Sequence, residues 1–227
     1  SGFDGLDTET TERVFALFNE SHMQYEADRG NDIAGEPSIA EMTSAAIKVL
    51  DNNEEGFFLM VESGRIDHAH HAGNAYGALY DTIAFAEAVD TADKLTDDEE
   101  TLIIVTADHG HVFTIAGYPK RGTPILGKVV NVGSDEAATA ADGTPYTTLG
   151  YANGPGAVKH DAGAGRPTPE TGVMAHQQAL VPLGSETHAG EDVALYANGP
   201  GAGSVRGVME QNLIYDVIRK AYGWPAD

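Results

Sequence analysis

Residues 57–71 read FFLMVESGRIDHAHH, and this stretch decides the fold class. Its first five residues form a continuous apolar run of strand length, which is typical of a strand buried on both faces of a parallel sheet. An alanine-rich stretch with helical character follows from about residue 72 to 95, and a second apolar run, TLIIVT, occupies residues 101–106. Strand, long helix and strand make a βαβ unit, so the sequence predicts an α/β fold.

Further elements are expected on both sides of this unit. Ser38 and Glu41 have the spacing of a capping box, which predicts a helix that ends near residue 51. Residues 192–196 have the character of a third sheet strand. Apolar residues then recur every four positions from Val205 to Ala221, which predicts an amphipathic C-terminal helix.

Between residues 115 and 186 the helical periodicity disappears, and Gly, Pro, Thr and Ala dominate. We expect three parts: the first part of an α/β core at 1–114, a loop-rich insertion at 115–186, and the last strand and C-terminal helix at 187–227. The heptapeptide YANGPGA occurs at 151–157 and again at 196–202. Two copies do not make a repeat protein, and they predict two strands that end in the same Gly-Pro turn.

The composition is strongly acidic. Asp and Glu number 35 against 13 Lys and Arg, which gives a formal net charge of -22. This balance argues against a nucleic-acid partner, because phosphate backbones are bound by clustered basic residues. Adaptation to a salty environment explains the excess of carboxylates, and an ordinary acidic protein with a few cation sites is the alternative. The chain has no Cys, which excludes disulfides and thiolate sites, and no apolar run long enough to span a membrane.

Five of the nine histidines fall in two short segments, 62–71 and 106–111, each at the carboxyl end of a predicted strand. Ligand sites of open α/β sheets lie at these ends. Carboxylates and imidazoles without thiolates are the ligands expected for catalytic zinc or for a harder divalent ion. Asp67 and His71 are four residues apart, so one helical turn presents both to a single ion.

Other residues extend this metal hypothesis. Asp108 and His109 are adjacent, which suits either separate roles or a strand end that curls around an ion. Glu62 follows a strand with no basic partner nearby, which also favours a cation. His188 precedes the third strand and could complete the first site as a third protein ligand, with one position left open. The plain alternatives are that a strand-end Asp caps a helix and that a single His is structural. We interpret three further histidines as structural or exposed: His22, His160 and His176.

These segments resemble the metal-binding motifs of alkaline phosphatases. Residues 57–71 resemble the family's central metal segment, VTADHGH at 105–111 its second, and ETHAGEDV at 186–193 its third, in the family's order. The resemblance runs from about residue 16 to 222 and is closest to the animal-type branch. In that branch GYPKRG at 117–122 and NGPG at 153–156 are similar to parts of the crown subdomain.

The resemblance implies a fold and a set of roles. The fold would be a mixed, mostly parallel central sheet flanked by helices, with an inserted crown. Two zinc ions and one magnesium ion are implied as cofactors, and His68 matches a position close to the bound phosphate. The implied ligands are Asp67, His71 and His188 for the first zinc, Asp108 and His109 for the second zinc, and Glu62 for the magnesium.

The sequence departs from the family in what it lacks. The family's serine nucleophile lies in an Asp-Ser-Ala type of segment, and no Asp-Ser pair occurs here. We therefore expect no nucleophile in this chain, which resembles the C-terminal half of the enzyme. The N-terminal half, as a separate or cleaved chain, is then the expected partner, and the isolated chain is expected to be inactive. Asn19 stands where the animal-type calcium site has a carboxylate, which puts that site in question.

Three functions follow from these features. The first is phosphomonoester hydrolysis by a zinc and magnesium enzyme, dimeric and periplasmic or extracellular as the family implies. The second is a superfamily relative, such as a phosphodiesterase, phosphomutase or sulfatase, which shares the two-metal core. The third is a non-catalytic, acidic, cation-binding fragment. Tight zinc in fixed stoichiometry distinguishes the first two from the third, and assays on different esters distinguish the first from the second.

The net charge of -22 predicts stability that depends on salt. Repulsion among the carboxylates destabilises the compact state at low salt, and added salt screens it. The midpoint of thermal unfolding should therefore rise between low salt and about 1 M salt, where the Debye length is roughly 3 Å. A midpoint that stays flat or falls over this range would rule out the repulsion.

Overall fold

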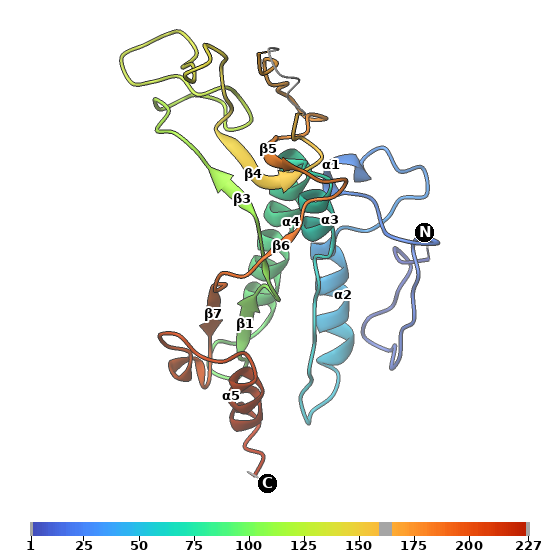
Figure 1. Ribbon diagram of the computed structural model, residues 1–227. Coiled ribbons are helices and arrows are strands. Elements are labelled where there is room, and N and C mark those ends of the chain that lie inside the picture. Colours follow the sequence, from blue (N-terminus) through green and yellow to red (C-terminus); the bar gives the residue numbers. More distant parts are fainter. Residues whose placement is uncertain (1, 159–164, 226–227) are drawn as a thin grey trace.

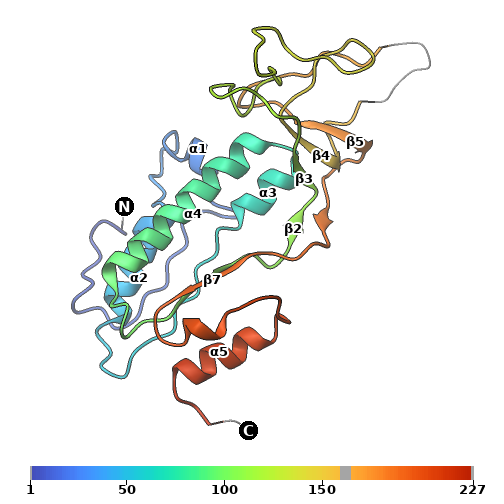
Figure 2. The same ribbon diagram turned by 90° about the vertical axis from the view of Figure 1, so that its left-hand side faces the viewer.

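The protein is described by a computed structural model of residues 2–158 and 165–225. Figure 1 shows an elongated molecule with helices at its centre. Helix α4 (Ala75–Leu95) packs against both α2 (Ile39–Leu50) and α3 (Arg65–His71). The insertion lies at one end of the molecule, and helix α5 (Leu213–Ala221) lies at the other (Figures 1 and 2).

The predicted capping box is confirmed at the start of α2. The Ser38 hydroxyl accepts from the Glu41 N–H at 3.1 Å, and the Glu41 carboxylate accepts from the Ser38 N–H at 2.7 Å. Both bonds satisfy N–H groups that a helix start would leave unpaired. The Ser38 N–H, together with the Ser38 hydroxyl that donates to the same carboxylate at 2.9 Å, holds the pKa of the Glu41 carboxyl below its ordinary value, because these bonds stabilise its charged form.

The long helix predicted from residue 72 is confirmed as α4, and a shorter helix, α3, precedes it. Gly73, with φ of +66°, separates the two helices. The Asn74 side chain caps α4 by accepting from the Gly77 N–H at 2.6 Å. Alanines make the buried face of α4, and their small side chains let α2 and α3 approach closely: Ala75, Ala78, Ala84 and Ala88.

The strands form three small sheets. In two of them the strands are antiparallel: β1 (Ile103–Thr106) pairs with β7 (Leu195–Asn198), and β2 (Gly110–His111) pairs with β6 (His188–Ala189). The third has the order β3-β4-β5 and is mixed, since β4 is antiparallel to β3 and parallel to β5. Its strands are β3 (Phe113–Ile115), β4 (Leu149–Gly154) and β5 (Gln178–Pro182). Two short helices complete the fold: α1 (Glu26–Arg29) and the 3-10 helix Ala202–Ser204.

The strand predicted at residues 57–61 does not form, so the predicted βαβ unit is incomplete. This segment is without regular secondary structure, and β1 pairs with β7 alone. Phe58 and Met60 are 62% and 75% exposed, while Phe57, Leu59 and Val61 are half-buried. A strand needs a neighbouring backbone to bond with, and no described segment pairs with this one. One side of this apolar segment, formed by Phe58 and Met60, is therefore exposed to solvent, and we call it the bare side.

The C-terminal helix was predicted too long. Helix α5 begins at Leu213 instead of Val205, and the chain between β7 and α5 makes turns. Gly207, with φ of +61°, lies in this stretch and interrupts any helix there. The predicted third strand is present as β7, although it starts three residues later than expected.

Both copies of the heptapeptide leave a strand at a glycine, as predicted. The first copy ends β4 at Gly154, with φ of +137°, and the second follows β7 with Gly199, with φ of +97°. At Gly199 a Cβ atom would collide with the carbonyl of Thr101, so this turn admits only glycine.

The described residues of the 115–186 insertion contain β4 and β5 and no helix. Their buried apolar residues include Val129, Leu149 and Tyr151, and Tyr151 also contacts Phe113 and His70 outside the insertion. Across the described parts of the chain, no helix combines the length and apolar character needed to cross a bilayer.

The molecule exposes more surface than its size requires. Its accessible surface is 14718 Å², whereas a compact monomer of 23.9 kDa exposes roughly 9,900 Å². The excess agrees with the bare apolar side of residues 57–61 and with other exposed apolar side chains, among them Phe15, Leu17 and Val208.

Asp81 gives the fold a pH dependence. This buried residue of α4 accepts from the Glu26 N–H with both oxygens at 3.3 Å. Burial raises the pKa of its carboxyl from 3.8 to about 6, although the Glu26 N–H partly opposes the shift. The folded state therefore keeps a proton that the unfolded state has lost between about pH 4 and pH 6, so this group lowers stability as pH rises through that window.

We expect Asp81→Asn, which keeps the acceptor and cannot titrate, to gain stability over the parent by on the order of 1–3 kcal/mol between pH 4 and pH 7. Denaturant unfolding at several pH values and fixed salt measures the difference. Glu87→Gln, at an exposed position of the same helix, controls for the loss of one negative charge. A difference that does not change with pH would contradict the raised pKa.

Candidate metal centre

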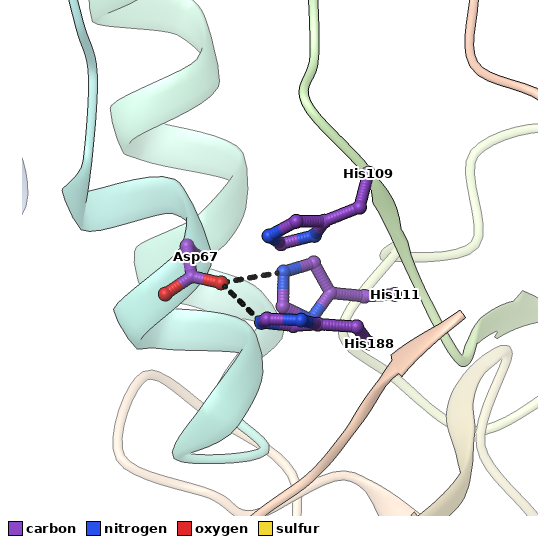
Figure 3. A group of neighbouring side chains, drawn as sticks. All are labelled: Asp67, His109, His111 and His188. Carbon is purple, nitrogen blue, oxygen red and sulfur yellow. Dashed lines mark ion pairs between the residues drawn. The ribbon is translucent and has the colours of Figure 1, made fainter. Parts of the chain in front are cut away.

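Three segments that are distant in sequence meet at the centre of the molecule. Helix α3 brings Asp67 and His71, strand β2 brings His111, and strand β6 brings His188. The antiparallel pairing of β2 with β6 places His111 directly opposite His188. Figure 3 shows the side chains of Asp67, His109, His111 and His188 converging on one point between α3 and the two strands.

Local geometry explains the position of each group. Asp67 and His71 lie one helical turn apart on α3, so they face the same way. The main chain fixes α3 to the third segment, because the Glu186 N–H donates to the His71 carbonyl at 3.0 Å. The Asp67 carboxylate thus lies between its own helix and the strand pair.

Three histidine side chains approach the same oxygen of Asp67. Its Oδ1 atom lies 3.4 Å from Nε2 of His71, 3.0 Å from Nε2 of His111 and 3.3 Å from Nε2 of His188. This oxygen is buried and accepts no well-aligned hydrogen bond. A buried carboxylate oxygen without a donor is costly, unless a cation neutralises it.

The spacing of these atoms fits a zinc ion. Nε2 of His71 and Nε2 of His188 are 3.1 Å apart, and each lies 3.3–3.4 Å from Asp67 Oδ1. Tetrahedral ligands about 2.05 Å from a zinc ion lie roughly 3.3 Å from one another. The three atoms therefore make one face of a zinc-sized tetrahedron. The His188 side chain is 50% exposed, so this face borders solvent.

His109 lies against this group. Its ring stacks on that of His188, with centroids 3.5 Å apart, and its ligand atom lies within 4.8 Å of those of Asp67, His111 and His188. Two imidazoles from β2 and the loop before it thus flank the carboxylate of α3.

Buried or half-buried polar side chains contact the histidines on the side away from Asp67. Glu186 accepts from Nδ1 of His111 at 2.7 Å, and its own carbonyl lies 2.6 Å from Nδ1 of His71. His70 stacks on His111 and pairs with the Tyr151 hydroxyl at 2.8 Å. Burial lowers the pKa of His70 to about 4, with the neighbouring His111 as the next contribution, so His70 is neutral at pH 7.

The structure brings four of the six predicted ligands together and leaves two apart. Asp67, His71, His188 and His109 lie in the clusters described above. Asp108 is 87% exposed, and its carboxylate lies 3.3 Å from the ring of His109. Two groups of ligand atoms lie close enough together to hold an ion: Asp67, His109, His111 and His188, and His71, His111 and Glu186. Glu62 is exposed and belongs to neither group.

His68, the predicted phosphate-site residue, lies on α3 beside Arg65. The Arg65 guanidinium lies 3.2 Å from Nδ1 of His68. Arginine can only donate, so Nδ1 accepts, and the hydrogen of the neutral ring is on Nε2. Desolvation lowers the pKa of His68, with His22 and Arg65 contributing after it.

The prediction that His22 and His176 are structural or exposed is confirmed. His22 is exposed and packs edge-on against His68, and His176 is exposed and bonds the Ala72 carbonyl at 2.8 Å. His160 lies outside the described residues. In the region of the questioned calcium site, the buried Glu36 accepts from the Asn19 amide at 2.8 Å and from the Gln24 N–H at 2.7 Å.

Sequence reasoning missed two members of the centre. The spacing of two between His109 and His111 is that of residues on one face of a strand, and this pattern is the signal that could have indicated a role for His111. Glu186 precedes His188 by two residues and has the same spacing. Its partners come from residues 71 and 111–112, and no local pattern reveals a contact across that distance.

The comparisons with known proteins all indicate the same family. The family model described as alkaline phosphatase matches residues 5–224. The chain is 44% identical over 213 residues to the tissue-nonspecific alkaline phosphatase of Gallus gallus, covering 92% of this chain and 39% of the relative. It is 42% identical over 220 residues to that of Homo sapiens, covering 95% of this chain and 40% of the relative. The chain thus spans about 40% of the length of these relatives.

Solved structures agree. A TAB5 alkaline phosphatase variant with magnesium bound in its M3 site superposes with a TM-score of 0.52 at 25% identity, over 83% of this chain and 42% of that chain. A second TAB5 variant, at 24% identity, gives a TM-score of 0.53 and covers 92% of this chain and 52% of that chain. Both support the predicted α/β fold.

Proposed function

The chain belongs to the alkaline phosphatase family, and on that premise we propose that it forms the metal-binding part of an enzyme that hydrolyses phosphomonoesters. The observation that carries this proposal is the triangle of Asp67 Oδ1, His71 Nε2 and His188 Nε2, whose edges of 3.1–3.4 Å match zinc coordination. These three residues are the proposed ligands of the first zinc.

The proposed second zinc is held by Asp108 and His109, and the proposed magnesium by Glu62. The position of His109 against His188 supports a second ion beside the first. Two metals about 3.5–4 Å apart stabilise the attacking and leaving oxygens of an in-line displacement at phosphorus. The magnesium in the solved TAB5 variant supports the third ion, for which Glu62 supplies one carboxylate.

The side chains of this chain have two further tasks in the proposed reaction. The His71 ring is oriented from behind by the Glu186 carbonyl, which leaves Nε2 toward the ion. His68 carries its ring hydrogen on Nε2, because Arg65 occupies its other nitrogen. That N–H is suited to donate to a phosphate oxygen, which supports His68 as a substrate-binding residue.

The proposed nucleophile is a serine in the N-terminal part of the complete enzyme, a part that this sequence does not contain. Three observations support such a part: the length of the relatives, the absence of an Asp-Ser pair in this sequence, and the excess exposed surface. The bare apolar side of residues 57–61 is the proposed contact, since it lies directly before α3. Alone, this chain would lack the group that attacks phosphorus.

Assembly and location are proposed on the family relationship. The complete enzyme is proposed to be a homodimer in the periplasm or outside the cell, and its acidic surface supports a salty environment. The carboxylate excess also argues against nucleic acid as a stable partner.

The function is tested on the complete enzyme with three esters. We expect a phosphomonoester to be hydrolysed much faster than a phosphodiester or a sulfate ester, with two tightly bound zinc ions per protomer. Residues 1–227 expressed alone should hydrolyse none of them at a meaningful rate. Preference for a diester or a sulfate would indicate a superfamily relative, and many weak, salt-sensitive ions without turnover would indicate a cation-binding fragment.

The first zinc is tested by His188→Ala. Loss of one of three protein ligands should raise the Kd for zinc more than about 100-fold, because changes outside the ligand set alone cost 10–100-fold. Zinc content after dialysis and phosphatase activity should fall together in the complete enzyme. His176→Ala, which removes an exposed histidine bonded to the Ala72 carbonyl, is the matched control. Full zinc content with unchanged turnover in His188→Ala would refute the assignment.

A further inference from the structure

Glu186 is an unusual carboxylate in this acidic chain. Its side chain is 0% exposed, and no lysine or arginine pairs with it among the described residues. Its Oε2 atom accepts from Nδ1 of His111 at 2.7 Å, and Oε1 accepts from the Val112 N–H at 2.8 Å. Burial of a charged group requires compensation of this kind, so the position has been built for a carboxylate.

The main chain of the same residue holds a second histidine. The Glu186 carbonyl lies 2.6 Å from Nδ1 of His71, and the Glu186 N–H donates to the His71 carbonyl at 3.0 Å. The backbone of Glu186 thus bonds both the ring and the carbonyl of His71. The side chain of Glu186 bonds the ring of His111.

These bonds determine where the ring hydrogens lie. A carbonyl oxygen can only accept, so Nδ1 of His71 bears the hydrogen, and its Nε2 keeps a lone pair facing Asp67. The carboxylate does the same for Nδ1 of His111, whose Nε2 is directed at Asp67 Oδ1 from 3.0 Å. Both rings are thereby held with Nε2 toward the same oxygen.

Glu186 is not placed to ligate the ion itself. Both of its oxygens are occupied by N–H donors, and the nearer approach to His71 is 3.7 Å, to the nitrogen that faces away from Asp67. The residue therefore acts through the histidines.

We propose that Glu186 is a positioning residue for the first zinc. Its peptide group orients the ligand His71, and its carboxylate orients His111, whose Nε2 lies 3.0 Å from Oδ1 of the ligand Asp67. This inference rests on the proposed zinc site and deepens it, because it assigns a role outside the ligand set. Orienting partners of this kind typically change metal affinity by 10–100-fold.

The side-chain part is tested by Glu186→Gln in the complete enzyme. The amide keeps the shape and can still accept from Val112, but its NH₂ group faces Nδ1 of His111 and cannot accept its hydrogen. Glu170→Gln, at an exposed carboxylate of the same insertion, is the control. Competition with a chelator should show a Kd for zinc that is about 10-fold higher in Glu186→Gln alone, the low end of the range for partners of ligands, because the carboxylate reaches the ligand Asp67 only through His111. Excess zinc should restore its activity, and the visible spectrum of the cobalt-substituted protein should change.

Equal zinc affinity and equal cobalt spectra in the parent and Glu186→Gln would overturn the proposal. Since the variant could fail to fold, imidazole nitrogen NMR of the unmodified, zinc-loaded enzyme gives an independent test. We expect slowly exchanging hydrogens on Nδ1 of His71 and His111, and a hydrogen on Nε2 of His71 would contradict the assignment. Affinity and NMR require no turnover, so they stand apart from the ester assays that test the proposed function.

Discussion

A single carboxylate oxygen organises the centre of this protein. Asp67 Oδ1 lies 3.0–3.4 Å from three imidazole nitrogens that come from helix α3, strand β2 and strand β6. A buried oxygen without an aligned donor is unfavourable, and a cation at this point converts the cost into attraction. In the proposed metal site, the segments around residues 67, 111 and 188 thus all depend on a cation beside Asp67 Oδ1. The pairing of β2 with β6 brings His111 and His188 close enough to that oxygen to share the cation.

The acidic character of the chain has a different meaning at its surface and at its centre. Most carboxylates face solvent, where they repel one another and respond to salt. Asp67, Asp81 and Glu186 are screened from solvent to different degrees, and each has specific partners: three imidazoles, a helix N–H, or an imidazole and a peptide N–H. The surface carboxylates make the stability of the fold depend on salt, whereas the carboxylates at the centre fix the positions of the groups that they bond.

Local sequence patterns predicted local structure well. The capping box at Ser38, the alanine-rich helix α4 and the strand β1 are present, and the pair Asp67 and His71 follows from helical spacing. The interpretation of His188 as a partner of that pair needed the family resemblance. The strand expected at residues 57–61 and the roles of His111 and Glu186 depend on backbones or side chains far away in sequence, and no periodicity within a segment carries that information.

The bare segment at residues 57–61 has a consequence for the order of events in assembly. It runs directly into α3, and only a short stretch separates Val61 from Asp67. Any segment of the complete protein that covers this bare side would anchor the start of the helix that carries two of the metal-facing groups. Ordering of α3 and covering of residues 57–61 would then be one cooperative step. The metal content of a preparation would accordingly report how much of it has folded completely.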